Sequence, residues 1–565
     1  MAFTFRHPYE PDPAFSARVA YFCMEYAIHQ PLKTYCGGLG YLAGSHLRSA
    51  FALRQNMVAI GILWKYGYYD QVRKGDRTMD VLFAEKNYGF LEKTDLRFPI
   101  QVAGHDVAVT AWYLPPEVYN TVPLFLLSTD LPENDYLART ISHRLYDPNP
   151  ETKIAASILL GLGGAKLLEE LGWEPQVYHL NESHALPLGF YLYDKYKDIG
   201  AVREKLVFTN HTPEDGGNPR SDIRLLEKMG FFSGIPITET AAIAHLSNNT
   251  LDHTSTALRL AGLANGVSKL HRQTLARMWG KEEGLCPVIS ITNGQNFHYW
   301  SDAEMYRQLG ANDDEGLRRR KGKCKEELFE VVADEEGEIF RKDVLTIVFA
   351  KRFSGYKRAD LLLRDMDRFT RMVTSKDRPV QVIWAGKPFP MDYTAIGIFD
   401  KVVDVCKAYR NCAILAGYEL RLSGILKRGA DVWLNVPRYL HEASGTSGMT
   451  AAMNGAINVS IADGWIPEFA RDKVNSFLIP AADPSLPEHE LDDRDAASLY
   501  DVLEKEVIPM YYDYPSRWLE IVKKSMQDII PQFDSDRLAT EYYQRLYKRG
   551  KTQGSPGKQS QTTAN

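Results

Sequence analysis

Cysteine is scarce in this sequence, and long apolar runs are missing altogether. The six cysteines among 565 residues are scattered, with no CxxC pair and no histidine at the spacing of zinc ligands, which argues against a disulfide framework or a structural zinc site. We also find no apolar stretch of about 18 residues, the length that suggests a membrane-spanning helix. We therefore expect reduced thiols, no association with a membrane and a cytoplasmic location.

An excess of basic charge is missing as well. The formal net charge is -5, so the chain has no broad positive field of the kind that attracts nucleic acid without sequence preference. The first residues contain neither a basic start with an apolar run nor a small-residue cleavage site, so we expect no signal peptide. No carboxylate cluster indicates a divalent metal. Any anionic ligand must therefore be held locally.

What is present is an alternation of strand and helix patterns that is typical of parallel α/β architecture. Short apolar runs predict strands at 19–22, 177–180, 206–209, 345–350, 380–385 and 432–436, and segments of helical period predict helices at 152–171 and 248–278. Because a single core stops growing at about 250 to 300 residues, a chain of 565 residues is expected to form two domains.

A polar, charged stretch at 301–343 separates two groups of predicted strands, so we place the domain boundary near 300. The predicted organisation is an N-terminal Rossmann-like domain at 1–300, a C-terminal Rossmann-like domain at 301–515, a helical segment at 516–548 and a disordered tail at 549–565. Ligands of open α/β folds bind beyond the carboxyl ends of the strands, which directs attention to the residues that follow them.

A glycine-rich turn at Gly37, Gly38 and Leu39 leads into a helical pattern. Glycines let backbone N–H groups approach an anion, and a helix N-terminus adds partial positive charge, so a phosphate could bind there. A tight turn that needs glycine for its backbone angles is the alternative.

A basic segment directly follows the predicted strand 345–350 and contains Lys351, Arg352, Tyr356, Lys357 and Arg358. Four cations so close together repel one another unless an anion or several carboxylates neutralise them. Arginine offers a bidentate fork and lysine a point charge, which suits a phosphoryl group. A solvated basic loop is the alternative.

Two further segments carry polar groups at strand ends. Small residues at 443–448 would let main-chain N–H groups face a ligand, and Glu442 could accept hydrogen bonds from sugar hydroxyls. An ordinary helix N-cap at Ser444 or Thr446 explains the same string. Histidines lie in the segments 179–184 and 208–213, where a structural role is as open as a catalytic one.

Taken together, these segments resemble the alpha-glucan phosphorylase family, which includes glycogen, starch and maltodextrin phosphorylases. The resemblance extends from about residue 20 to residue 465. It rests on GGLG at 37–40, HLNE at 179–182, NHTP at 210–213, NGVSKLH at 265–271, ITNG at 291–294, KRxxxYKR at 351–358, AGK at 385–387, DVWLN at 431–435, EASGTSGM at 442–449 and DGW at 463–465.

The resemblance implies a GT-B fold, in which two Rossmann-like domains face each other across a cleft and a C-terminal helix crosses back to the first domain. Dimers are common in the family, so a homodimer is one option. By resemblance, Gly38, Arg352 and Lys357 hold the substrate phosphate; Lys351, Tyr356 and Thr446 border a cofactor phosphate; Glu442, Ser444 and Gly445 bind sugar hydroxyls; and His211 contacts the sugar near its sixth oxygen. The candidate catalytic residues are Arg352, Lys357, His211 and Glu442.

The chain departs from the family at Thr450, where the family has the lysine that carries pyridoxal phosphate. A threonine hydroxyl cannot form the Schiff base, so we expect no covalently bound cofactor at this position. Without the cofactor, two adjacent phosphate subsites resemble a site for a diphosphate.

Three hypotheses follow. The first, which Thr450 favours, is a retaining glycosyltransferase without pyridoxal phosphate that moves a hexosyl group from a nucleotide-diphosphate sugar to a glucan or small-molecule acceptor. The second is an alpha-glucan phosphorylase that releases glucose 1-phosphate. The third is an inactive glucan-binding or regulatory protein. The sequence specifies neither the nucleobase nor the acceptor.

Overall fold

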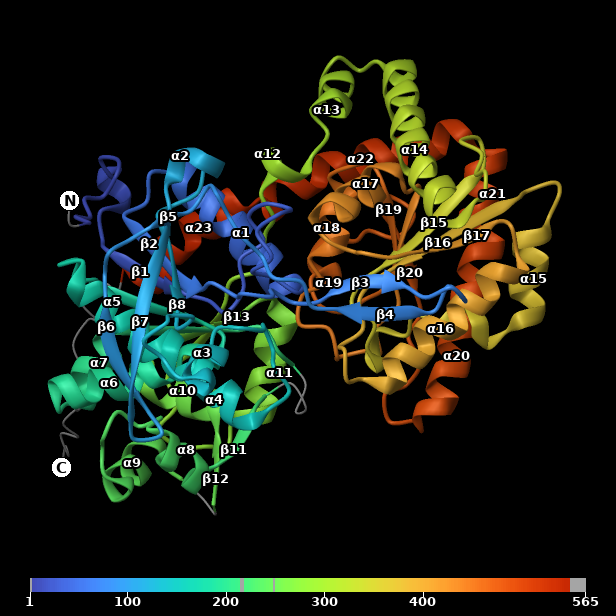
Figure 1. Ribbon diagram of the computed structural model, residues 1–565. Helices are drawn as coiled ribbons and strands as arrows, with labels where there is room; N and C mark the ends of the chain where they lie inside the picture. Colours follow the sequence, from blue (N-terminus) through green and yellow to red (C-terminus); the bar gives the residue numbers. More distant parts are fainter. Residues whose placement is uncertain (1–2, 214–217, 247–248, 549–565) are drawn as a thin grey trace, which may run out of the picture.

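The protein folds into two α/β lobes, as seen in a computed structural model that describes residues 3–213, 218–246 and 249–548. The N-terminal half of the chain forms one lobe, blue to green in Figure 1, and the C-terminal half forms the other, yellow to orange. Each lobe is built on a mainly parallel sheet with helices packed on it. This arrangement confirms the predicted α/β class with two Rossmann-like units and is consistent with the GT-B fold. The tail predicted at 549–565 lies outside the described residues.

The first sheet reverses its strand order next to its first strand. In spatial order it contains β14 (Val288–Ser290), β13 (Leu263–Gly266), β10 (Leu206–Asn210), β9 (Val177–Asn181), β1 (Val19–Phe22), β2 (Met57–Ile62), β8 (Leu124–Ser128), β7 (His105–Leu114) and β5 (Glu92–Lys93). The chain builds outward from β1 through β2 and β8, then returns to the other side of β1 with β9. The reversal therefore falls between β1 and β9.

The second sheet is parallel throughout and reverses in the same way. In spatial order it contains β17 (Cys412–Leu415), β16 (Val380–Ala385), β15 (Leu345–Ala350), β18 (Val432–Asn435), β19 (Ile457–Ile461) and β20 (Ser476–Ile479). Its reversal falls between β15 and β18. Because ligands bind where strand order reverses, the loops after β1, β9, β15 and β18 are where a site is expected.

The predicted strands are confirmed, and those at 19–22, 345–350 and 380–385 have the same ends in the structure. The predicted helix at 152–171 is also confirmed as α4 (Pro150–Ile158) and α5 (Gly164–Glu170), joined by a turn of π-helix.

The predicted helix at 248–278 is wrong. Its described part contains α10 (His253–Leu260), strand β13 and α11 (Lys269–Trp279). The segment between the two helices is apolar enough to continue the helical pattern, but it pairs with β10 in the buried sheet instead. Sheet pairing therefore overrides the local pattern here.

A hairpin of the first lobe reaches across to the second. It consists of β3 (Asp70–Arg73) and β4 (Met79–Leu82), drawn in blue against the second lobe in Figure 1. The Gln71 side-chain amide donates to the carbonyl of Gly386 at 3.1 Å. The Arg73 guanidinium pairs with the buried Glu336 carboxylate at 2.7 Å. The hairpin thus ties the two lobes together by polar contacts.

The end of the described chain crosses back to the first lobe, as the resemblance implies. Helix α22 (Pro515–Phe533) packs on the second lobe, whereas α23 (Ser535–Glu541) packs on α1 (Gly38–Ala52) of the first. The hydroxyls of Ser49 and Ser535 lie 2.6 Å apart across this contact. The lobes are therefore joined by both the hairpin and the C-terminal helices.

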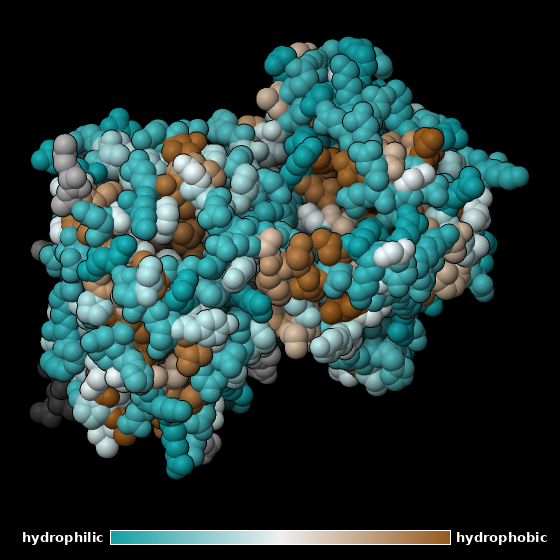
Figure 2. Space-filling view, in the orientation of Figure 1, coloured by the Kyte–Doolittle hydropathy of each residue, from teal (hydrophilic) through white to brown (hydrophobic). Residues whose placement is uncertain are grey.

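The face seen in Figure 2 is mainly hydrophilic, with hydrophobic residues gathered near the middle of the view, where the lobes meet. Among the described residues, no helix combines the length and the apolar character needed to cross a lipid bilayer.

Candidate active site

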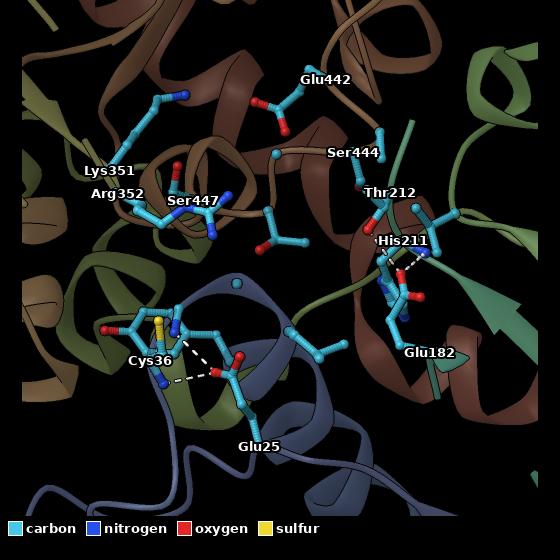
Figure 3. Close-up of a pocket in the computed structure, with 18 of the residues that line it drawn as sticks. Glu25, Cys36, Glu182, His211, Thr212, Lys351, Arg352, Glu442, Ser444 and Ser447 are labelled. Atoms are coloured by element: carbon cyan, nitrogen blue, oxygen red, sulfur yellow. Dashed lines mark hydrogen bonds between the residues drawn. The ribbon is translucent and has the colours of Figure 1, made fainter. Parts of the chain in front are cut away.

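A cavity of about 390 Å³ lies between the lobes, where the loops of the two strand-order reversals face each other. Every residue predicted for the site lines it: Gly37, Gly38, Leu39, His211, Lys351, Arg352, Tyr356, Lys357, Glu442, Ser444, Gly445 and Thr446. Figure 3 shows Lys351, Arg352 and Glu442 on the opposite side of the cavity from Glu25 and Cys36. The fold therefore brings these residues together, while their individual roles remain predictions.

The glycine-rich turn supplies the N-terminus of α1, which begins at Gly38. The first N–H groups of a helix have no acceptor within the helix, so those of Gly38 and Leu39 can bind a ligand. A methyl group added at Gly38 would meet no heavy atom within 4 Å, which means that the backbone here borders open space. The geometry suits an anion close to the main chain.

Gly37 lines the cavity as predicted, but its amide already has an acceptor within the chain. It donates to the Glu25 carboxylate at 3.0 Å, and the Cys36 amide donates to the same oxygen at 2.7 Å (Figure 3). The other oxygen of Glu25 accepts a hydrogen bond from Tyr146 at 2.5 Å. Glu25 follows β1 and holds the turn in place. The sequence reasoning missed it, because no local pattern marks a single glutamate as the partner of a distant loop.

The cations of the basic segment differ in how they are held. Arg352 is exposed to the cavity, and no acceptor is bonded to it among the described residues. Lys357 is paired with the carboxylate of Glu442. Burial alone would raise the pKa of Glu442, but Lys357 and Lys351 outweigh it and keep that pKa below its ordinary value. The carboxylate is therefore charged, and it neutralises one of the cations.

Lys351 is buried beside this pair. Its amine donates to the side chain of Asn435, which in turn donates to Asn458 at 2.7 Å. Burial, with a contribution from the charge on Lys357, lowers the pKa of Lys351 to about 7. A lysine near half-charge takes up a proton when an anion arrives, because the anion stabilises the ammonium form.

Arg358, the fourth cation of the segment, does not join the cavity. It is buried and bonded to Asp492 at 2.9 Å and to Asp495 at 2.7 Å. It anchors the loop to α20 (Glu488–Val502). The segment therefore divides into three cavity cations and one structural cation, a distinction that depends on long-range carboxylates.

Unpaired polar atoms on the cavity wall suit sugar hydroxyls. The Ser444 hydroxyl and the side-chain oxygen of Asn293 are buried without a hydrogen-bond partner in the described part of the chain. Gly445, next to Ser444, has a φ of +83°, which favours glycine. Asn293 was not predicted as a site residue, although the ITNG string that contains it was noted. Buried polar groups without partners are rare, which makes them candidate ligand contacts.

Glu182 and His211 border the cavity from the first lobe. Glu182 follows β9 with a φ of +71°, a region that non-glycine residues rarely occupy. Its carboxylate accepts the backbone N–H of His211 at 2.5 Å (Figure 3). Burial raises the pKa of Glu182 to about 7 and lowers that of His211 to about 3, so His211 is neutral. His179 is structural instead, bonded to Thr209 and Tyr547 away from the cavity.

Comparison with known proteins shows which family this chain belongs to. A family model of carbohydrate phosphorylases matches residues 253–476. A maltodextrin phosphorylase of Thermococcus litoralis is 34% identical over 96% of this chain and 73% of its own length. The chain belongs to the carbohydrate phosphorylase family. A glycogen phosphorylase of Aquifex aeolicus is 30% identical over 95% of this chain and 87% of its own, and an uncharacterized protein of Methanocaldococcus jannaschii is 44% identical over 94% and 99%.

Carbohydrate phosphorylases are expected to carry pyridoxal phosphate, and the residues here fit it only in part. Lys351, Thr446 and the start of α18 (Ser447–Ala452) suit its phosphate group. The position that the resemblance assigns to the attachment lysine does not fit. Thr450 is 1% exposed, and its hydroxyl donates to the Ser447 carbonyl at 3.0 Å. A covalent bond to the cofactor therefore needs an amine from elsewhere in the chain.

Proposed function

We propose that this chain catalyses alpha-glucan phosphorolysis, in which a terminal hexosyl group passes to inorganic phosphate and glucose 1-phosphate is released. The observation that carries the proposal is the convergence of Arg352, Lys357 and the first turn of α1 on one cavity, in a chain 34% identical to a maltodextrin phosphorylase. A site of this kind can bind a phosphate next to a sugar. Whichever donor it uses, the chain is a glycosyltransferase-type enzyme of this family.

The charges suit a phosphate that enters and leaves. The guanidinium of Arg352 has no bonded acceptor in the described chain and can grip two phosphate oxygens in a bidentate manner. Lys357 can turn from Glu442 toward the same phosphate. The N–H groups of Gly38 and Leu39, at the N-terminus of α1, can donate hydrogen bonds to its oxygens. These groups stabilise charge on the phosphate as the glycosidic bond breaks.

The sugar is held on the opposite wall. Glu442, the Ser444 hydroxyl and the Asn293 oxygen can bond its hydroxyls, and the main chain at His211 lies on the same cavity. We propose that the phosphate oxygen attacks from the face that the acceptor sugar leaves, so that anomeric configuration is retained. When bound, pyridoxal phosphate supplies a second phosphate group that acts as an acid toward the first.

A second candidate is transfer from a nucleotide-diphosphate sugar without pyridoxal phosphate. Thr450 favours it, because a chain that lacks the attachment lysine leaves the Lys351 and Thr446 side of the cavity available to a second phosphate of the donor. The acceptor would be a glucan or a small molecule.

One experiment separates these candidates. The purified chain is incubated with maltooligosaccharides and inorganic phosphate, with and without added pyridoxal 5′-phosphate, and glucose 1-phosphate is measured. In parallel, nucleotide-diphosphate glucoses are supplied with the same oligosaccharides, and nucleoside diphosphate is measured. Release of glucose 1-phosphate supports phosphorolysis, and nucleoside diphosphate release alone supports the second candidate. Oligosaccharide binding without either product would mean an inactive glucan-binding protein.

A further inference from the structure

Lys427 is a buried amine without a polar partner. It lies on α17 (Leu420–Gly429) and is 1% exposed. Its Nζ is 3.9 Å from the centre of the Trp300 ring and 5.5 Å from that of Tyr41. Among the described residues, neither a carboxylate nor a hydrogen-bond acceptor is bonded to it. By contrast, the buried Lys321 donates to the carbonyls of Arg428 and Asn454 at 2.9 and 3.1 Å.

Packing does not explain this amine. A leucine or methionine would fill the same space without burying a polar group, and a buried polar group without a partner is destabilising. Burial lowers the pKa of Lys427 well below its ordinary value, which favours the amine form with a free lone pair over the ammonium form. Neutral, desolvated lysine amines are nucleophiles toward carbonyl carbon.

The position of Lys427 relates it to residue 450. The side-chain amide of Asn454 donates to the carbonyls of both Trp300 and Thr450, at 2.9 and 2.7 Å. Met449 and Ala452, on the same helix as Thr450, share one apolar cluster with Trp300 and Tyr41. Tyr41 also lines the central cavity. Lys427 is therefore linked to residue 450 through Trp300 and Asn454, and to the cavity through Tyr41.

We propose that Lys427 is the attachment residue for an aromatic aldehyde of the pyridoxal phosphate class. The Trp300 and Tyr41 rings suit an aromatic ring, and Lys351 with Thr446 suits its phosphate. The Nζ lone pair attacks the aldehyde carbon, the carbonyl oxygen leaves as water with the two amine protons, and a C=N bond remains. The inference rests on the phosphorolytic function proposed above, and it assigns the cofactor to α17 instead of α18.

The test maps the labelled lysine. The full-length chain is incubated with pyridoxal 5′-phosphate, reduced with borohydride, digested and analysed by mass spectrometry. The expected result is a reduced pyridoxyl group on Lys427, none on Lys321, and an imine absorbance band before reduction. Lys427→Met, which keeps a chain of similar length, is expected to lose both label and band. Lys387→Met, which removes a cavity amine already paired with Glu419, is the matched control and keeps the label on Lys427.

Absence of label, or label confined to Lys351, Lys387 or surface lysines of the wild-type chain, overturns the inference. The wild-type map decides the question even if a variant fails to fold. Label on Lys427 without glucose 1-phosphate release would sink the proposed function and leave the attachment site standing. Glucose 1-phosphate release without label on Lys427 would refute the attachment site and leave the proposed function supported.

Discussion

Arg352 and Lys357 are two cations of the cavity wall that are held in different ways. Lys357 and Glu442 neutralise each other, whereas Arg352 is exposed and has no bonded acceptor among the described residues. Arg352→Ala is therefore expected to reduce turnover by about 10²–10³-fold, as for loss of one charge-stabilising donor, with little change in thermal midpoint. Initial rates and thermal unfolding measure both. The control is Arg364→Ala, which removes a surface arginine paired with Asp493 and should leave turnover unchanged.

Lys427 gives a stability prediction that is independent of any ligand. Because it is buried and unpaired, Lys427→Met is expected to raise the free energy of unfolding by about 1–3 kcal/mol at pH 7. The pKa of Lys427 is lower in the folded chain than in the unfolded one, so the unfolded chain binds more protons and wild-type stability gains with rising pH. The advantage of the variant should therefore shrink toward about pH 10. Urea unfolding at several pH values measures this, and a constant difference would contradict it.

At the residue scale, the sequence singled out residues that share one cavity wherever a motif marks them. The strings at 351–358 and 442–449 placed their residues around one cavity, and Thr450 was visible as a departure. Lys427 was not visible, because a lysine in a helix is ordinary until its surroundings are known. The sequence marked Arg358 only as one of four neighbouring cations, and its structural role was not visible because its partners Asp492 and Asp495 are distant in sequence.

The β3–β4 hairpin is the element whose contacts the sequence did not predict. Arg73→Ala removes one of the two arginines that neutralise Glu336, whose side chain is 3% exposed, and is expected to lower the free energy of unfolding by about 1.5–3 kcal/mol. Urea unfolding measures the loss. Arg318→Ala, which removes an exposed pairing with Glu315, should change stability by less than about 0.5 kcal/mol. Equal losses in the two variants would contradict a bracing role for the hairpin.

Strands were predicted better than helices at the element scale, for a physical reason. Strands of a parallel sheet are buried on both faces and read as short apolar runs, which is how β1, β15 and β16 were found. The segment 248–278 has mixed periodicity, and β13 within it is fixed by pairing with β10 and β14, neither of which is local.

The two lobes depend on the C-terminal helices as a unit. Leu538, Tyr542, Tyr543 and Leu546 are fully buried in the first lobe. A chain that ends at Phe533 loses the burial of these four side chains, which contributes about 6–12 kcal/mol to the free energy of unfolding. This loss is comparable with the entire stability of a typical domain, about 5–15 kcal/mol. We expect the shortened chain to unfold at a much lower temperature or to aggregate. A chain that ends at Lys548 is the control and should keep the full-length midpoint.

Two whole-molecule expectations from the sequence, a homodimer and a cytoplasmic location, stay predictions. The domain boundary near 300 falls between the last strand of the first sheet and the first strand of the second. A single boundary does not describe the molecule completely, because the β3–β4 hairpin of the first lobe contacts the second lobe.

The Lys357–Glu442 ion pair couples the binding of phosphate to the binding of sugar. A phosphate that draws Lys357 away releases the Glu442 carboxylate to accept sugar hydroxyls, and a bound sugar that engages Glu442 releases Lys357 to the phosphate. Such coupling is reciprocal and typically amounts to about 5-fold or more in affinity. Titration calorimetry should therefore find tighter sugar binding in the presence of phosphate, and the ratio should fall toward one in Glu442→Gln. The ion pair therefore opposes the binding of either ligand alone and favours the binding of the two together.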